Sequence, residues 1–259
     1  MERIKTLSPW SGMHEVKTPS RMSGMQGIKI LSLWSGMLGF VVVALGAWTR
    51  LADAGLGCPD WPGCYGFVTI PVSPEEIDIA NSKYPDTPYE VAKAIPEVVH
   101  RYFAAALGFM ILCIAFLAFR YKDLPSDVRK LSFFLIAWVI MQGTFGYWTV
   151  SLKLWPQVVT THLMSGFLTT GLLWLLYFKT KDRLQNRTTW NFGVKTKKLF
   201  NISIVLVAIQ IFLGAWTSTN YASYSCVDFP LCQGQILPES NFKEGFDFFQ
   251  SIGPNYLGG

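Results

Sequence analysis

Residues 45–64 read LGAWTRLADAGLGCPDWPGC, and residues 213–232 read LGAWTSTNYASYSCVDFPLC. The two stretches lie 168 positions apart, and an ungapped alignment of 45–66 with 213–234 gives 11 identities in 22 positions. In each copy an apolar run ends on LGAWT and is followed by a loop with a Cys-x5-Cys pair. Repetition of one helix end and its loop predicts a chain built by tandem duplication of a structural unit.

The composition is typical of a membrane protein. Hydrophobic residues make up 51% of the 259 positions and charged residues only 15%, against roughly 25% charged in an average soluble domain. The apolar residues fall into runs close to the roughly 20 residues that cross a bilayer as a helix. We therefore predict an all-α membrane protein, with candidate spans at 28–49, 98–119, 131–152, 157–178 and 199–219.

The charges predict the orientation of these spans. Of the 22 Lys and Arg residues, 16 lie in 1–30, 120–130 and 179–198, whereas 12 of the 17 acidic residues lie in 50–97 and 220–259. Lys and Arg gather in cytoplasmic loops, so the N-terminus is expected in the cytoplasm and both Cys-x5-Cys loops outside. The net charge of +5 then reflects topology, and no nucleic-acid partner is expected.

The order of the spans predicts a tandem pair of antiparallel four-helix bundles. The expected division is a cytoplasmic tail at 1–27, a first bundle at 28–178 with a long outer loop at 50–97, a cytoplasmic linker at 179–198, and the start of a second bundle at 199–259. The repeat places counterparts of His100 and His162 near positions 268 and 330, so the second bundle is expected to be incomplete in this chain.

The outer loop at 50–97 contains two helix-start patterns. Ser73-Pro74-Glu75-Glu76 and Thr87-Pro88-Tyr89-Glu90 each combine a hydroxyl cap, a proline in the first turn and a glutamate three positions after the cap. They predict two short helices on the outer face. Pro96 is then expected to open the second span.

His100 and His162 are the histidines that fall inside predicted spans, two and five residues from the outer ends. Polar ionisable residues inside a membrane are costly and usually functional. Two imidazoles facing each other in a bundle can ligate haem iron. Small residues follow on the same helix faces, at Ala104, Gly108 and Gly166. These could accommodate a flat macrocycle, although membrane helices also use small residues simply to pack together.

Three charged residues near the outer ends of the spans are further candidates. Glu97 shares a helix face with His100 and could act as a base or stabilise positive charge, or merely interact with the helix dipole. With the two histidines it could also form a two-histidine, one-carboxylate iron site. Arg50 and Arg101 could bind haem propionates, or simply extend to the membrane interface.

The five cysteines divide into two groups. Cys113 is in mid-span and is expected to be a small core residue. The pairs Cys58/Cys64 and Cys226/Cys232 lie in loops expected outside, where each pair can close a disulfide. A local loop clamp and a redox role both remain open for these pairs.

Several phrases occur in a recognisable order: LGAWTRLADAGLGCPDWPGCYG at 45–66, PEVVHRYFAAALG at 96–108, QGTFGYWTVSLKLWPQVVTTHLMSG at 142–166, and the second LGAWT with its Cys pair. Over residues 36–235 the chain resembles the heme A synthase family. The resemblance implies eight spans in two four-helix units, each with a histidine pair for a haem. It also implies an oxidoreductase that oxidises the C8 methyl of heme O to the formyl of heme A for cytochrome c oxidase.

The resemblance assigns roles to residues. Glu97 matches a glutamate implicated in catalysis, and His100 and His162 match the axial ligands of the first unit, where heme O is the substrate. A heme b that relays electrons is implied in the second unit, and its two histidine ligands are not expected among the residues of this chain. Disulfides Cys58-Cys64 and Cys226-Cys232 are implied.

The resemblance also implies partners and a location. Heme O synthase, cytochrome oxidase assembly factors and an unidentified electron donor are expected partners within the lipid bilayer, and a homo-oligomer is compatible with the sequence. A bacterial inner membrane is favoured over the mitochondrial inner membrane. Two other functions are compatible with these residues: a quinone-linked thiol-disulfide oxidoreductase, and a bis-histidine haem electron-transfer or assembly subunit.

Overall fold

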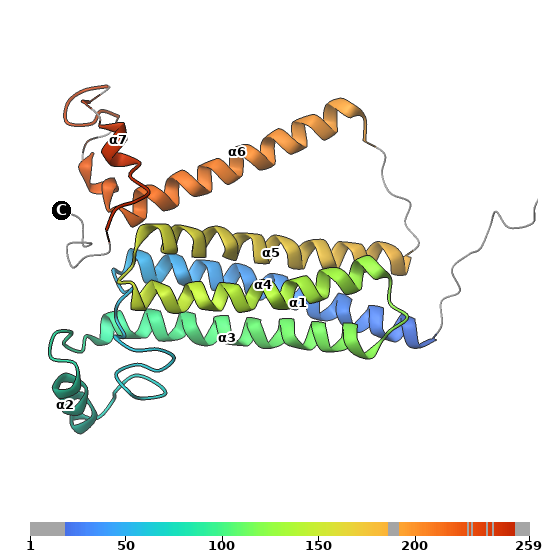
Figure 1. The fold of residues 1–259 in the computed structure, drawn as a ribbon, viewed down its shortest axis with the longest axis horizontal. Helices are drawn as coiled ribbons and strands as arrows, with labels where there is room; N and C mark the ends of the chain where they lie inside the picture. Colours follow the sequence, from blue (N-terminus) through green and yellow to red (C-terminus); the bar gives the residue numbers. More distant parts are fainter. Residues whose placement is uncertain are drawn as a thin grey trace, which may run out of the picture.

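A computed structural model describes residues 19–185, 192–226, 228, 230–236, 238–239 and 241–251. Five long helices dominate it (Figure 1): α1 (Pro19–Leu51), α3 (Val91–Arg120), α4 (Ser126–Ser151), α5 (Pro156–Gln185) and α6 (Val194–Thr219). Three short helices lie at the end of the molecule that carries the disulfide loops: α2 (Pro74–Lys83), a 3-10 turn (Ala222–Ser225) and α7 (Phe242–Gly245). This end is called the outer end below, after the predicted topology. All five long helices are apolar and long enough to cross a membrane, which confirms the predicted class of all-α membrane protein.

The long helices extend beyond the predicted spans. α1 begins at Pro19, inside the predicted tail, and α5 and α6 together reduce the predicted linker 179–198 to the residues between Gln185 and Val194. The extensions carry much of the basic charge. Lys and Arg side chains can reach the water interface from a helix that continues past the hydrocarbon. Predictions from hydropathy alone therefore make these helices too short.

The first four long helices form an antiparallel bundle (Figure 1). Among the described residues, α1 packs against α3 and α5, and α4 packs against the same two helices, whereas neither α1 and α4 nor α3 and α5 pack against each other. The bundle is therefore a square in which α1 is diagonal to α4 and α3 is diagonal to α5. α6 packs against α5 at the outer end and diverges from it along its length (Figure 1).

The apolar core fills the inner half of this bundle. Its buried members are Met25, Ile28, Leu107, Ile111, Ile114, Ala118, Leu124, Val128, Leu135, Leu173 and Leu176. In contrast, no residue in 40–48, 99–106 or 136–151 is fully buried. The outer half of the square is thus less completely filled by its own side chains than the inner half.

The predicted helix start at Ser73 is confirmed. The Ser73 hydroxyl accepts the Glu76 N–H at 3.2 Å, and the Glu76 carboxylate accepts the Ser73 N–H at 3.1 Å, which is a complete capping box at the start of α2. Hydrogen bonds from the backbone N–H groups of Val72 and Ser73 lower the pKa of Glu76. These two bonds favour the charged carboxylate.

The predicted helix start at Thr87 is wrong, because residues 87–90 are not helical, Glu90 is extended and α3 begins at Val91. The Tyr89 N–H donates to the Asn81 side chain at 2.8 Å, and this tertiary bond ties the segment to α2. Pro96 consequently lies inside α3 and does not open it. Its carbonyl accepts the Thr49 hydroxyl of α1 at 3.1 Å.

The two Cys-x5-Cys loops have matching hydrogen bonds. The Asp60 carboxylate accepts the N–H groups of Tyr65 and Gly66 at 2.6 and 2.7 Å. Asp228 makes the same pair of bonds to the residues five and six positions further on, at 2.8 Å each. Each loop thus folds around an aspartate at the same place in the repeated stretch, and these bonds lower the pKa of Asp228.

Two contacts join the outer ends of α1 and α6. Arg50 donates through Nε to the Ser218 hydroxyl at 3.2 Å and through a second nitrogen to the Ser218 carbonyl, and its guanidinium stacks on the ring of Tyr221. The Tyr221 hydroxyl contacts the Asp53 carboxylate at 3.2 Å. Both hydrogen-bonded pairs join positions 168 apart, so each residue meets its own counterpart in the repeated stretch.

Tyr65 gives a testable pH dependence outside the membrane. Its ring is buried between Tyr84 and Tyr89, and its hydroxyl donates to the Pro88 carbonyl at 3.2 Å. Burial raises the pKa of Tyr65 to about 12, and the Glu90 carboxylate acts in the same direction.

Because an exposed phenol ionises near pH 10, this raised pKa adds stability that is fully present below about pH 10 and is lost as the pH rises through about 12. We expect the absorbance titration of Tyr65→Phe to differ from wild type by one late-ionising phenol. A difference that titrates near pH 10 would contradict the buried environment.

Candidate functional site

The two membrane histidines lie on diagonally opposite helices of the first bundle. His100 is on α3 and His162 is on α5, each close to the outer end of its helix. The Nδ1 atom of each imidazole is buried and has no hydrogen-bond partner among the described residues. Buried polar atoms are normally paired, so these two nitrogens are candidates for binding a ligand at this level of the bundle.

The helices that flank the histidines provide space for their rings. The imidazole of His100 lies against Gly46 of α1, and that of His162 lies against Gly146 of α4. On α1, α3 and α4 this outer level lies within the stretches that have no fully buried side chain, whereas α5 buries Val158, Thr160 and Ser165 there. Walls that keep part of their apolar surface open are typical of a ligand site, and a planar apolar group such as haem fits these residues.

Glu97 lies one helical turn outward from His100 and faces the disulfide loop. Its side chain is 4% exposed. One carboxylate oxygen accepts the Cys58 N–H at 2.8 Å, and the other pairs with Arg101. The glutamate therefore connects α3 to the loop that covers the outer end of the bundle.

Neither predicted propionate-binding arginine is free of protein contacts. Arg101 pairs with Glu97 and donates to the backbone carbonyls of Asp60, at 2.9 Å, and Gly63. Arg50 is held by Ser218 of α6. The propionate contacts stay a prediction, while the structure shows both guanidiniums fixing outer segments to the helices.

The two predicted disulfides are formed, and Cys113 is free. Cys58 and Cys64 have no exposed surface. Thiol-disulfide exchange requires an attacking thiolate to reach a sulfur atom, so the buried first pair is poorly placed for that chemistry. Its observed contact with Glu97 favours a loop clamp at this position.

Gln142 is a site residue that the sequence interpretation missed. Its side-chain amide donates to the His162 carbonyl at 2.8 Å, and its amide oxygen accepts the Ser165 hydroxyl. These bonds fix α4 to α5 beside the histidine. The sequence could have indicated Gln142, because it is a polar residue inside an apolar span. Such residues are usually functional, as charged residues are.

The two-histidine, one-carboxylate iron site lacks geometric support. In the part of the chain that the structure describes, no three His, Cys, Asp or Glu side chains come together as a group that could hold a metal ion. Glu97 is turned toward Cys58 and Arg101. The arrangement therefore suits two axial ligands with a planar group between them better than three ligands on one face.

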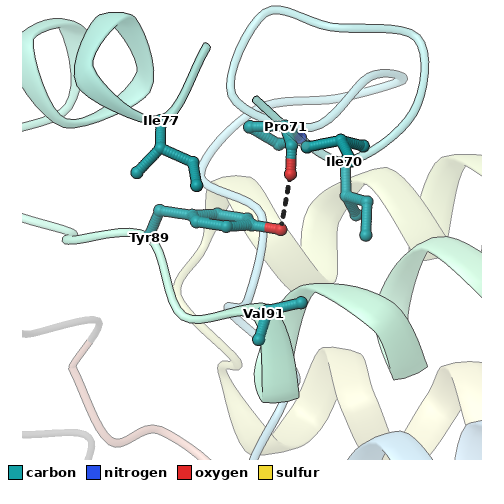
Figure 2. A pocket seen from close by; sticks show the side chains of 6 residues that line it. Ile70, Pro71, Ile77, Tyr89 and Val91 are labelled. Carbon is teal, nitrogen blue, oxygen red and sulfur yellow. Dashed lines mark hydrogen bonds between the residues drawn. The ribbon is translucent and has the colours of Figure 1, made fainter. Parts of the chain in front are cut away.

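A separate pocket of about 440 Å³ lies in the outer loop. Figure 2 shows Tyr89 between Ile77 and Val91, with its hydroxyl donating to the Pro71 carbonyl. That bond measures 2.9 Å. The lining is apolar and includes none of the predicted site residues. It comes from residues 70–72, from Ile77 of α2, from Tyr89, and from Val91 at the start of α3.

Comparison with known proteins identifies relatives of the whole first bundle. The family described as cytochrome oxidase assembly protein (COX15-CtaA) matches residues 29–252. The chain is 41% identical over 218 residues to the heme A synthase of Shewanella oneidensis, covering 83% of this chain and 64% of that protein. It is 26% identical over 215 residues to the heme A synthase of Alkalihalophilus pseudofirmus, covering 82% and 66%.

A heme A synthase from Wolbachia sp. subsp. Brugia malayi is 28% identical over 221 residues, covering 78% of this chain and 65% of that protein. The chain thus spans slightly less than two thirds of the length of these relatives. No solved structure matches it significantly.

Proposed function

Since this chain belongs to the COX15-CtaA family of cytochrome oxidase assembly proteins, we propose that it forms the heme O-oxidising part of a heme A synthase. In this proposal heme O binds between His100 and His162, and its C8 methyl is oxidised to the formyl of heme A for cytochrome c oxidase. The observation that carries the proposal is the pair of histidines on diagonal helices at the outer level of one bundle, each with an unpartnered Nδ1.

The reaction balances as two successive two-electron oxidations. The methyl becomes an alcohol and then an aldehyde, so one oxygen atom is gained overall, and with water as its source four electrons and four protons are released. Molecular oxygen is the other candidate source. When bound, heme O supplies an iron that can pass electrons. A heme b in the second bundle and an external redox partner are proposed to carry these electrons.

The protein groups hold the substrate and manage protons. His100 and His162 would ligate the iron from two sides and fix the macrocycle at the outer level of the bundle. Glu97, one turn further out, is proposed to accept a proton or to stabilise positive charge at the reacting carbon. The loop that Glu97 and Arg101 hold over this end would restrict the access of water.

The proposed setting follows from the same assignment. Heme O synthase would supply the substrate, and cytochrome oxidase assembly factors would receive the product. The protein is an integral membrane protein, and we propose the bacterial inner membrane as its location, with both disulfide loops outside.

The test is conversion of heme O in cells. The complete protein that carries this chain would be produced in a host that makes heme O but no heme A, and the extracted haems would be identified by mass. We expect heme A to appear only when the protein is present. Bound haem without any oxidation of the methyl would overturn the enzymatic proposal and favour an electron carrier. Purified protein without haem would overturn both readings.

A further inference from the structure

Gly46 and Gly146 each lie in contact with one of the two imidazoles. A Cβ atom added to Gly46 would be 3.1 Å from Cε1 of His100, and one added to Gly146 would be 3.3 Å from Cε1 of His162. Both distances are shorter than ordinary van der Waals contact, which begins at about 3.4 Å. Absence of a side chain at these two positions lets each ring rest against the neighbouring helix.

The two contacts are related by the layout of the bundle. Gly46 lies on α1 and Gly146 on α4, which form one diagonal of the square, and the histidines lie on the other diagonal. Both glycines begin a Gly-x-Trp-Thr sequence near the outer end of an outward-running helix. The same local sequence therefore supports a ring on each side of the space between His100 and His162.

Among the described helical glycines, Gly46 and Gly146 are the two at which an added Cβ would meet a histidine. Gly24, Gly27, Gly36 and Gly39 approach Tyr121, Leu117, Trp174 and Thr170 at least as closely, whereas several other helical glycines lie in open space. A Cβ atom at Gly108 of α3, Gly143 of α4 or Gly214 of α6 would meet nothing within 4 Å. Glycine in a helix interior is unfavourable relative to alanine because it costs more backbone entropy. At Gly46 and Gly146 a close approach explains why this cost is borne.

The backbones around the rings are fixed by hydrogen bonds, so an added methyl group would have to move the ring. The Thr49 hydroxyl holds α1 to the Pro96 carbonyl of α3 at 3.1 Å, one turn outward from His100. The Gln142 amide holds α4 to the His162 carbonyl at 2.8 Å. Cε1 lies between the two ring nitrogens, so a displacement of Cε1 turns both nitrogens.

We propose that Gly46 and Gly146 are positioning residues that set the orientation of the His100 and His162 imidazoles for axial ligation. The inference rests on the proposed function, because it concerns the ligands of the haem. It adds a requirement for the helices that carry no ligand: each must present bare backbone to the ring beside it.

The first experiment compares Gly46→Ala and Gly146→Ala with two matched controls in the complete, purified protein. Gly143→Ala changes the same helix as Gly146 three residues earlier, and Gly214→Ala changes the counterpart of Gly46 in the repeated stretch, both in open space. The measurements are haem content per protein and the low-spin ferric signal in electron paramagnetic resonance. We expect the haem content of Gly46→Ala and Gly146→Ala to fall roughly threefold to tenfold, which is the effect of forcing one side chain about 30° off its rotamer. Their low-spin ferric signal should also shift.

The controls are expected to keep both wild-type haem content and the wild-type signal. Alanine favours a helix more than glycine does, so weaker helices cannot explain a loss at positions 46 and 146. Wild-type haem content and signal in both test variants would overturn the positioning role while leaving the proposed function intact. Absence of haem from the wild-type protein would overturn both.

A second measurement does not depend on haem. In haem-free protein, thermal unfolding is compared for Gly46→Ala, His100→Ala and the double variant. We expect Gly46→Ala to lower the melting temperature when His100 is present and to leave it unchanged or raise it in the His100→Ala background. An equal effect in both backgrounds would show that the added methyl group does not meet the ring, and would overturn the inference.

Discussion

Replacing His100 or His162 by alanine is expected to remove the bis-histidine haem spectrum of the first bundle and to stop heme A formation. Each substitution deletes one of the two side chains that face the proposed ligand from diagonal helices. Changes to groups that merely support metal ligands cost 10- to 100-fold in affinity or activity, so loss of a ligand itself should cost at least roughly 100-fold. Haem content and heme A yield in the complete protein provide the measurement.

The matched control is His14→Ala, which removes a histidine from the basic N-terminal segment outside the described residues. It should leave both the spectrum and the yield unchanged. An intact bis-histidine spectrum in the His100→Ala and His162→Ala variants would show that the first bundle does not ligate haem through this pair.

Replacing Glu97 by glutamine is expected to lower heme A formation by about 10²- to 10⁴-fold, the usual contribution of a positioned acid or base, while the bound haem is retained. Glutamine has nearly the shape of glutamate and its amide oxygen can still accept the Cys58 N–H. It cannot accept a proton in the relevant range, and it carries no negative charge. Single-turnover conversion of heme O in purified protein separates this effect from substrate binding.

Two companion variants distinguish proton transfer from loop attachment. Arg101→Ala removes the ion pair and the bonds to the Asp60 and Gly63 carbonyls but keeps the Glu97 carboxylate. Glu76→Gln alters an outer-loop glutamate that caps α2 and should have little effect on conversion. If Glu97→Gln converted heme O at the wild-type rate while Arg101→Ala did not, the carboxylate would serve only to hold the loop.

The fold class could be predicted from the sequence because hydropathy and charge act over whole segments. Long apolar runs identified the five long helices, whereas the orientation that the Lys and Arg distribution indicates stays a prediction. The capping box at Ser73 was also predictable, because all of its hydrogen bonds are local. The similar pattern at Thr87 failed because the Tyr89 N–H is taken by Asn81, eight positions earlier in the chain.

The sequence indicates the residue types of the candidate site, which stays a prediction, but not the contacts that those residues make. His100 and His162 stood out because they are the histidines within apolar spans. The partner of Glu97 is a backbone N–H at Cys58, 39 positions away, and that of Arg50 is 168 positions away. Contacts at such separations depend on how the bundle closes, which no local pattern records.

The paired contacts between the ends of α1 and α6 show one difference between a duplicated chain and a dimer of identical chains. In a symmetric dimer of two identical chains, the same contacts would join each residue to the same residue of the other chain. Position 50 would then place arginine against arginine, and position 53 would place aspartate against aspartate. In one duplicated chain the two copies vary independently, so Arg50 faces Ser218 and Asp53 faces Tyr221. A duplicated chain can thus form hydrogen bonds between unlike groups at these paired positions, whereas a symmetric dimer of identical chains would place identical groups together there.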